Sequence, residues 1–113
     1  MTDCIFCKIA AGELPSTKVY EDEEILAFRD LYPVAPVHVL FIPKKHFPNL
    51  GEASEEDRAL LGKMLLVIGR EAAGLGLADG YRVVSNCGES AGQSVEHFHL
   101  HVMGGIDMMW PPG

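Results

Sequence analysis

The chain has 113 residues, of which 48% are hydrophobic and 22% charged, a balance typical of one globular domain over residues 1–113 rather than a disordered segment. Its net charge of −7 argues against a polymeric nucleic-acid partner, although local backbone N–H groups and histidines could still bind a mononucleotide. No apolar run approaches the roughly 20 residues needed to cross a bilayer, and the first residues lack the basic and apolar regions of a signal peptide. We therefore expect a cytoplasmic protein with no membrane partner.

The first half of the chain predicts one short helix and three short strands. Gly12 ends the helix, and Pro33 and Pro36 exclude regular structure around them. β-branched and aromatic residues favour a buried strand just before Pro43. The predicted segments are a helix over 4–10, strands over 18–21, 24–29 and 38–43, and loops over 30–37 and 43–51.

A capping box opens the one long predicted helix. Ser54 is followed three residues later by Asp57, in the place that Glu or Gln usually holds. The residues that keep the 3.6-residue period, and so should face the core, are Leu61, Met64, Leu65, Ile68 and Ala72. A Gly-Leu-Gly break over 74–76 ends the helix.

Three further apolar residues of this helix, Leu60, Leu66 and Val67, lie outside the predicted core stripe. A helix that is apolar on more than one side needs a second surface to cover it, so we expect a homodimer interface here. The alternative is that these residues are scattered exposed side chains with no partner.

The last part of the chain predicts two more strands and a tail without regular structure. The strands span 81–86 and 94–103, with a loop of small residues over 87–93 between them. The prolines of the 108–113 tail prevent it from continuing as a helix or a central strand. Together these elements predict an α+β fold, a five-stranded antiparallel sheet with one long helix and a short N-terminal helix.

Three of the five histidines fall within five residues near the end of the chain. On a strand, His97, His99 and His101 would share one face, about 7 Å apart in succession. The residues between and beyond them, Phe98, Leu100 and Val102, would then join the core. The histidine face could be a solvated polar surface, a three-histidine metal site, or a set of nucleophilic and acid–base groups.

The preceding loop helps to choose among these interpretations. Gly92, Gln93 and Ser94 place a glycine, an amide and a hydroxyl directly before the histidines. Such a loop can aim backbone N–H groups at phosphate oxygens and bring side chains to a leaving group, whereas a zinc site gains nothing obvious from it. The sequence therefore favours histidine chemistry on a phosphate.

The run 97–103 resembles the signature of the histidine triad (HIT) proteins, in which three histidines alternate with hydrophobic residues and two more hydrophobic residues follow. The segments that match the family in order are 4–9, 27–31, 35–38, 42–46 and 92–94. The ending Trp110-Pro-Pro-Gly113 is similar to the Hint branch, the purine nucleoside phosphoramidases. The resemblance covers nearly the whole chain and implies a dimer with a continuous ten-stranded sheet.

The resemblance also implies a covalent mechanism centred on His99. This histidine would attack the α-phosphorus and form a nucleotidyl-histidine intermediate, which water then hydrolyses. His101 and the backbone around Ser94 would stabilise charge on the phosphoryl oxygens, and the Ser94 hydroxyl would help to protonate the departing amine. His97 and His38 would lie behind the nucleophile, orienting rings and fixing tautomers.

A purine nucleotide site follows from the same resemblance. Asp30 would hold the ribose hydroxyls, and Trp110 would lie near the partner subunit's site. The implied base pocket consists of Ile5, Phe6, Phe28 and Leu31. Asn86 and Gln93 would contact the phosphate or ribose, and Gly92, Ser94, His99 and His101 complete the implied nucleotide site.

Cys4-x-x-Cys7 supplies half of a zinc site, for which His46 and His97 are the candidates to complete the ligand set. Some bacterial members of the family resemble this pattern and hold a structural zinc; the chemistry itself would need no cofactor. The alternatives are two ordinary buried cysteines and, less favoured without a βαβ pattern, a redox pair. The third cysteine, Cys87, is either a packed small residue or a sensitive thiol.

The resulting hypothesis is a hydrolase of purine nucleoside 5′-phosphoramidates, including aminoacyl adenylates such as lysyl-adenylate. One alternative is a dinucleoside polyphosphate hydrolase that uses the same nucleophile. Another is a nucleotide-binding regulatory module whose hydrolysis is incidental. A catalytic three-histidine zinc enzyme ranks below these.

Overall fold

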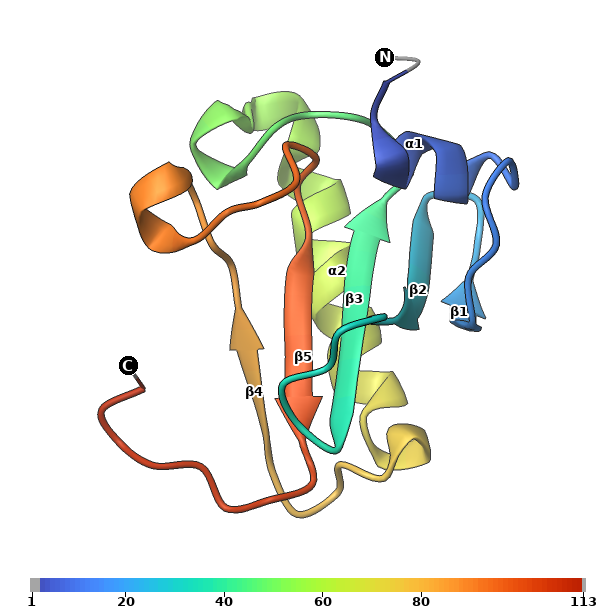
Figure 1. Cartoon of the computed structure of the whole chain (residues 1–113). Helices are drawn as coiled ribbons and strands as arrows, with labels where there is room; N and C mark the ends of the chain where they lie inside the picture. Colours follow the sequence, from blue (N-terminus) through green and yellow to red (C-terminus); the bar gives the residue numbers. More distant parts are fainter. Residues whose placement is uncertain (1–2, 113) are drawn as a thin grey trace.

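The computed structural model describes residues 3–112, which form one sheet with a helix on each face (Figure 1). The helices are α1 (Ile5–Ala10) and α2 (Arg58–Glu71). The strands are β1 (Lys18–Glu21), β2 (Ile25–Arg29), β3 (Val37–Pro43), β4 (Tyr81–Val84) and β5 (Leu100–Gly104). Single 3-10 turns are present at Leu50–Glu52, Glu55–Asp57, Ala73–Leu75 and Glu89–Ala91. No helix within the described part of the chain is long and apolar enough to cross a membrane.

The sheet has five strands in the order β1-β2-β3-β5-β4, and every neighbouring pair is antiparallel. β3 and β5 lie at its centre, and their register places Leu40 opposite His101 and Val39 opposite Val102. Side chains alternate between the two faces of a strand, so this register sets which face each histidine occupies. The α+β fold expected from the sequence is confirmed.

The larger core lies between the sheet and α2. It contains Val39, Phe41, Phe98, Leu100 and Val102 from the sheet side, all buried. The helix contributes Leu60, Met64, Val67, Ile68 and Ala72. The predicted helix face was therefore partly wrong: Leu65 is 57% exposed, whereas Leu60 and Val67 belong to the core. The apolar residues cover so much of the helix surface that the period alone does not fix which stripe packs.

The smaller core lies on the opposite face, under α1. Phe6 and Ile9 of the helix pack on four strand residues, Leu26, Phe28, Leu40 and Ile42. Cys4 caps the helix, since its sulfur accepts a hydrogen bond from the Cys7 N–H at 3.3 Å. Gly12 follows with a positive φ of 81°, the left-handed conformation that ends the helix as expected.

The last predicted strand, 94–103, was too long at its start, because pairing begins only at Leu100. The segment before it is held by other contacts: the Phe98 N–H donates to the Phe47 carbonyl at 2.7 Å. The alternation nevertheless persists, because Phe98 is buried in the α2 core while the neighbouring His99 lies on the α1 face against Phe6. β4 is likewise shorter than the predicted 81–86.

The predicted capping box forms at the start of the helical segment. The Ser54 N–H donates to the Asp57 Oδ2 at 2.9 Å, and the Asp57 carboxylate also pairs with Lys45. The hydrogen bond from Lys45 is the main cause that lowers the pKa of Asp57. One turn of 3-10 helix precedes α2 proper, so the regular helix begins at Arg58 rather than directly after Ser54.

Candidate active site and metal-binding group

A cavity of about 300 Å³ opens on the α1 face of the sheet. Eight predicted site residues line it together: Ile5, Phe6, Phe28, Asp30, Leu31, Ser94, His99 and His101. Further lining residues that the sequence reasoning missed include Ile9, Pro15, Ser16, Leu40 and Val95. Of these, Leu40 carried a usable signal, because it sits two residues after His38 on the same strand face. Most of the cavity wall is apolar, and Arg29 is the only lysine or arginine on it among the described residues.

His99 sits in this cavity with one ring nitrogen already engaged. Its Nδ1 lies 2.7 Å from the backbone carbonyl oxygen of His97, which can only accept, so Nδ1 carries the proton. The neutral ring therefore has its lone pair on Nε2. The ring is only 6% exposed and meets Phe6 edge to face, with 5.1 Å between ring centroids. A neutral imidazole with a fixed tautomer is a competent nucleophile.

His101 is oriented by a chain of polar groups behind it. The Val34 N–H donates to His38 Nδ1 at 3.1 Å, so the proton of neutral His38 is on Nε2. That Nε2–H points to His101 Nδ1, 2.9 Å away, with an Asp30 oxygen at 3.4 Å. His101 Nδ1 must then accept, which leaves its Nε2–H as a donor. Burial lowers the pKa of His38, and burial together with His99 and His38 lowers the pKa of His101 to about 4.

A second hollow of about 410 Å³ adjoins the cavity and shares Asp30, Tyr32, Ser94 and His101 with it. Its remaining lining is Val34, His38, Val84, Asn86 and Met103. Two compartments thus meet at Ser94 and His101, one mostly apolar and enclosed by α1, the other lined by loop and strand residues. A substrate with two parts joined at a phosphorus atom would span them.

The loop before the histidines is held in place by Gln93. Its side-chain oxygen accepts from the Gly88 N–H at 2.8 Å, and its amide nitrogen donates to the carbonyls of Pro48 and Val95. Gly92 has a positive φ of 90°, which allows the turn that delivers Ser94 to both compartments. The structure thus places the Gln93 side chain inside the loop, and its contact with a nucleotide remains a prediction.

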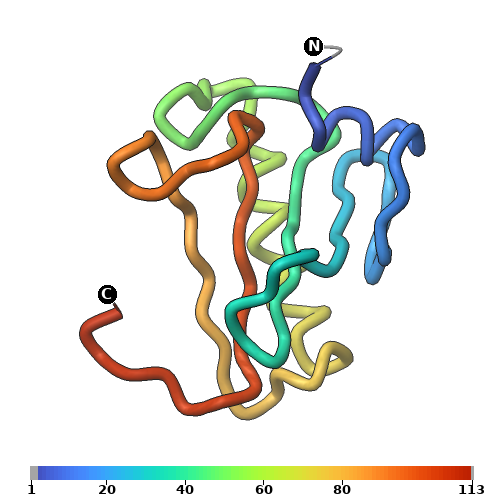
Figure 2. The backbone as a smooth tube through the Cα atoms, viewed as in Figure 1, coloured from blue at the N-terminus to red at the C-terminus, as the bar shows by residue number. Residues whose placement is uncertain are grey.

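A second group of predicted residues meets beside the cavity. Cys4, Cys7, His46 and His97 bring their ligand atoms within 4.8 Å of one another. His97 Nδ1 lies 3.3 Å from the Cys4 sulfur and 3.1 Å from His46 Nδ1, and His46 Nδ1 lies 3.3 Å from the Cys7 sulfur. Figure 2 traces the three segments that converge at this end of the sheet, the N-terminal helix in blue, the coil after β3 in green and the turn before β5 in red.

The donor set of this group fits a metal ion. Two thiols and two imidazole nitrogens at such spacing form a set that binds a tetrahedral metal. The Nε2 of His97 lies 2.7 Å from the Pro43 carbonyl oxygen and must donate to it, so Nδ1 presents its lone pair to the group. Burial and the adjacent Cys4 raise the pKa of the Cys7 thiol to about 11, so a bound cation would have to displace its proton.

His97 thus divides its contacts between two sites. Its ring belongs to the cysteine and histidine group, whereas its backbone carbonyl, not its ring, contacts the His99 imidazole. His38 lies behind His101 rather than behind His99. Both histidines were expected to act behind the nucleophile. In the structure only the backbone of His97 contacts His99, and His38 contacts His101 instead. The catalytic roles of both residues remain predictions.

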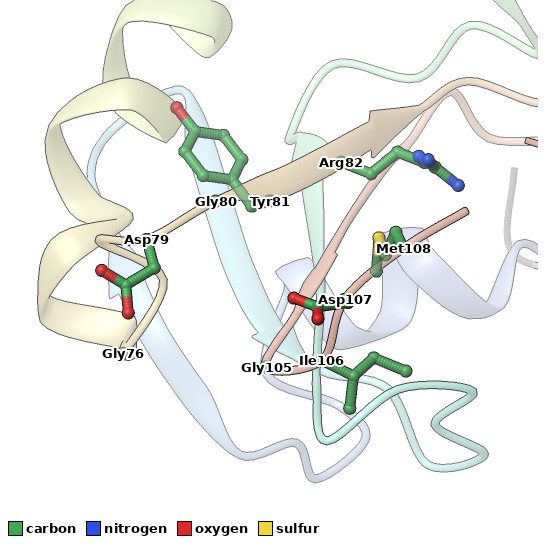
Figure 3. Close-up of a pocket in the computed structure, with 9 residues that line it drawn as sticks. All are labelled: Gly76, Asp79, Gly80, Tyr81, Arg82, Gly105, Ile106, Asp107 and Met108. Carbon is green, nitrogen blue, oxygen red and sulfur yellow. The ribbon is translucent and has the colours of Figure 1, made fainter. Parts of the chain in front are cut away.

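The tail and a third hollow lie away from these sites. A hollow of about 460 Å³ separates the start of β4 from the segment after β5, with Asp79 and Asp107 beside it (Figure 3). Arg82 on β4 donates to the Met109 carbonyl at 2.8 Å and so holds the tail. Trp110 is 80% exposed, and its expected place near a partner's site is untested in a single chain.

Comparison with known proteins agrees with this geometry. The family model described as "Scavenger mRNA decapping enzyme C-term binding" matches residues 3–110. An uncharacterized HIT-like protein of Synechocystis is 53% identical over 111 residues, 98% of this chain and 97% of that protein. Protein HitA of Neisseria gonorrhoeae is 50% identical over 104 residues, 92% of this chain and 97% of its own.

Solved structures extend the likeness to three dimensions. A HIT family hydrolase from Legionella pneumophila has a TM-score of 0.95 at 49% identity, over 98% of this chain and 100% of the other. A histidine triad protein from Clostridium difficile has a TM-score of 0.92 at 46% identity, over 96% of each chain. The family match over nearly the whole sequence, together with relatives of this identity and coverage, shows that the chain belongs to the histidine triad family.

Proposed function

We propose that this chain is a single-domain hydrolase of purine nucleoside 5′-phosphoramidates, with His99 as the nucleophile. The observation that carries the proposal is the His99 Nδ1–H bond to the His97 carbonyl, because it leaves the Nε2 lone pair as the reactive position of a ring that lines the cavity. The Legionella relative is named a hydrolase, which supports the reaction class.

The reaction proceeds in two balanced steps. His99 Nε2 forms a bond to the α-phosphorus while the phosphorus–nitrogen bond to the amine breaks, and the leaving amine takes up a solvent proton relayed by the Ser94 hydroxyl. Water then attacks the phosphorus and releases one proton to solvent while the bond to His99 breaks, which yields the free nucleotide and restores the neutral imidazole. Splitting the hydrolysis in this way replaces one difficult displacement with two easier ones.

His101 stabilises the charge that develops on the phosphoryl oxygens. Its Nε2–H is the donor left free by the hydrogen bond from His38, and its lowered pKa keeps the ring neutral at pH 7. A fixed donor in a partly buried site is worth about 3 kcal/mol of barrier reduction, since removing one such donor costs roughly 10²–10³ in kcat. The His38 ring acts through His101 and is a positioning residue.

The nucleoside occupies the apolar compartment and the amine occupies the adjoining hollow. Ile5, Phe6, Phe28 and Leu31 provide the flat apolar surface that a purine needs. The Asp30 carboxylate, which lines both compartments, accepts hydrogen bonds from the ribose hydroxyls. Asn86 and the backbone at Gly92 and Gln93 face the phosphate and ribose.

The four-residue metal group binds zinc. The ligands are Cys4, Cys7, His46 and His97, and the ion supplies structural cross-linking with no part in cleavage of the phosphorus–nitrogen bond. Thiolate ligands of this kind persist in a reducing compartment, which supports a cytoplasmic location.

The working molecule is a homodimer with a ten-stranded sheet. β4 is the last strand in the sheet order, so the backbone N–H and C=O groups along its outer edge point away from the sheet. Four apolar residues are exposed in the single chain, Tyr81 and Val83 on β4 and Leu65 and Leu66 on α2. Pairing of two β4 strands would cover both features, and Trp110 would then reach the partner subunit's site.

A comparison of substrates tests the proposal. Adenosine 5′-phosphoramidate and its alkylamine derivatives should be hydrolysed by the wild-type chain, and His99→Asn should lose this activity while the dimer stays folded. Faster hydrolysis of diadenosine polyphosphates would point to the second enzyme candidate instead. Unchanged turnover in His99→Asn, or tight nucleotide binding with only trace hydrolysis, would overturn the proposed enzyme.

A further inference from the structure

We propose that metal binding by Cys4, Cys7, His46 and His97 tightens the nucleotide site, so that the metal and the nucleotide raise each other's affinity. This inference rests on the proposed function, because it takes the cavity of His99 as the place where a purine nucleotide binds. It concerns binding energy rather than the chemical step. Two separate structural routes join the metal group to that cavity.

The first route is through His97 itself. The Nδ1 of its ring lies 3.3 Å from the Cys4 sulfur and 3.1 Å from His46 Nδ1, while its Nε2 donates to the Pro43 carbonyl. The carbonyl of the same residue accepts the Nδ1–H of His99 at 2.7 Å. Fixing the His97 ring on a metal therefore fixes the carbonyl that sets the tautomer and the direction of the ring meeting the phosphate.

The second route is through α1. Two ligands belong to this six-residue helix and its cap, and a helix so short has little stability of its own. The same helix supplies Ile5 and Phe6 to the cavity wall. Phe6 meets His99 edge to face at 5.1 Å between ring centroids and Phe28 at 5.6 Å. Anchoring Cys4 and Cys7 therefore anchors the wall that contacts the base.

Through both routes, a bound metal orders the nucleotide site in advance, so the protein loses less conformational entropy when the nucleotide binds. Linkage requires the effect to be reciprocal, so the factor by which the metal raises nucleotide affinity equals the factor by which the nucleotide raises metal affinity. Couplings between two sites in one protein are usually about 5–150-fold. We expect at least about a fivefold effect here, since the metal group and the cavity share His97 and α1 directly.

Calorimetric titration of the full chain with AMP and with adenosine, before and after zinc is removed by a chelator, tests the coupling. Far-UV circular dichroism checks that the metal-free chain keeps its secondary structure. The dissociation constant for AMP should rise at least about fivefold on zinc removal. Zinc removal should weaken the binding of adenosine less than that of AMP, because adenosine contacts the α1 wall but has no phosphate to contact His99. In a chromophoric chelator competition, saturating AMP should raise zinc affinity by the same factor.

A matched pair of variants keeps the test decisive if the metal-free chain unfolds. Cys7→Ser weakens the metal group and should weaken AMP binding in the presence of zinc, whereas Cys87→Ser removes an exposed thiol outside the group and should not. Equal AMP affinity with and without zinc, or in both variants and the wild-type chain, would overturn the coupling and leave the proposed function standing. If AMP does not bind the zinc-loaded protein at all, the proposed function itself fails.

Discussion

The end of β5 packs so closely on its surroundings that adding a single methyl group there should destabilise the fold. A Cβ placed on Gly104 would lie 2.5 Å from Leu77 Cδ2 and 2.9 Å from the Gly80 carbonyl oxygen. The Leu77 side chain is only 1% exposed, so it can yield only into the core, and the Gly80 oxygen is part of the backbone. Overpacking of this kind costs about 1–3 kcal/mol, and we expect Gly104→Ala to lie near the upper end.

Thermal unfolding followed by circular dichroism measures this cost. A loss of about 3 kcal/mol corresponds to a fall in Tm of roughly 13 °C for a domain of this size. Gly74→Ala is the matched control, because its Cβ would meet nothing within 4 Å and its backbone conformation is open to other residues. That variant should gain about 0.5–1 kcal/mol. Equal stability of the two variants would refute the close packing of β5 against Leu77 and Gly80.

Three further predictions concern assembly and charge. Leu66→Glu places a charge on the exposed apolar face of α2 and should convert the proposed dimer into a monomer in analytical ultracentrifugation, whereas the control Leu50→Glu should remain dimeric. Burial alone raises the pKa of Asp22, but hydrogen bonds from Tyr20 and the backbone lower it from 3.8 to about 2. Its carboxylate therefore stabilises the fold above pH 4, by at most about 2 kcal/mol, and this contribution is lost as the pH falls through about 2. In urea unfolding, Asp22→Asn should be less stable than wild type at pH 7, and the difference should shrink towards pH 2; a constant difference would contradict the assignment. Because burial lowers the pKa of His101 to about 4, its neutral Nε2–H form should persist at pH 5.5 in nitrogen-15 NMR spectra, and the imidazolium or the Nδ1–H form there would contradict the proposed relay.

The alternation of the three histidines with core residues was predictable from the sequence, but the length of the strand that carries them was not. Alternation of His99 and His101 with buried Phe98 and Leu100 holds in the structure. The strand starts only at Leu100, because the segment before it bonds to the coil after β3 instead of to a neighbouring strand. Such a contact between distant segments leaves no periodic signature in the sequence.

The helix shows the limit of periodicity more sharply. The capping box forms where it was predicted, one 3-10 turn before α2, yet Leu65 of the predicted core stripe is exposed and Val67 is buried. Residues such as Leu60 and Leu66 make the helix apolar around much of its surface. The stripe that packs is then chosen by the position of the helix on the sheet, a tertiary effect that local pattern does not contain.

How His97 divides its contacts between two sites was not predictable from the sequence. The family resemblance implied a support for the nucleophile, and the Cys4-x-x-Cys7 pair made His97 a candidate metal ligand. Only the fold separates them, giving the ring to the metal group and the backbone carbonyl to the His99 ring. The His38 to His101 contact was similarly hidden, since 63 residues separate the two rings in sequence.

Mass spectrometry of protein quenched during turnover tests the nucleophile most directly. With adenosine 5′-phosphoramidate as substrate, we expect an acid-labile adenylyl adduct that maps to the peptide containing His99, and its absence in His99→Asn. A longer-lived adduct should accumulate when the second step is slowed by low temperature. An adduct on another residue, or rapid turnover with no adduct under conditions that trap one on a control phosphohistidine enzyme, would contradict attack by His99.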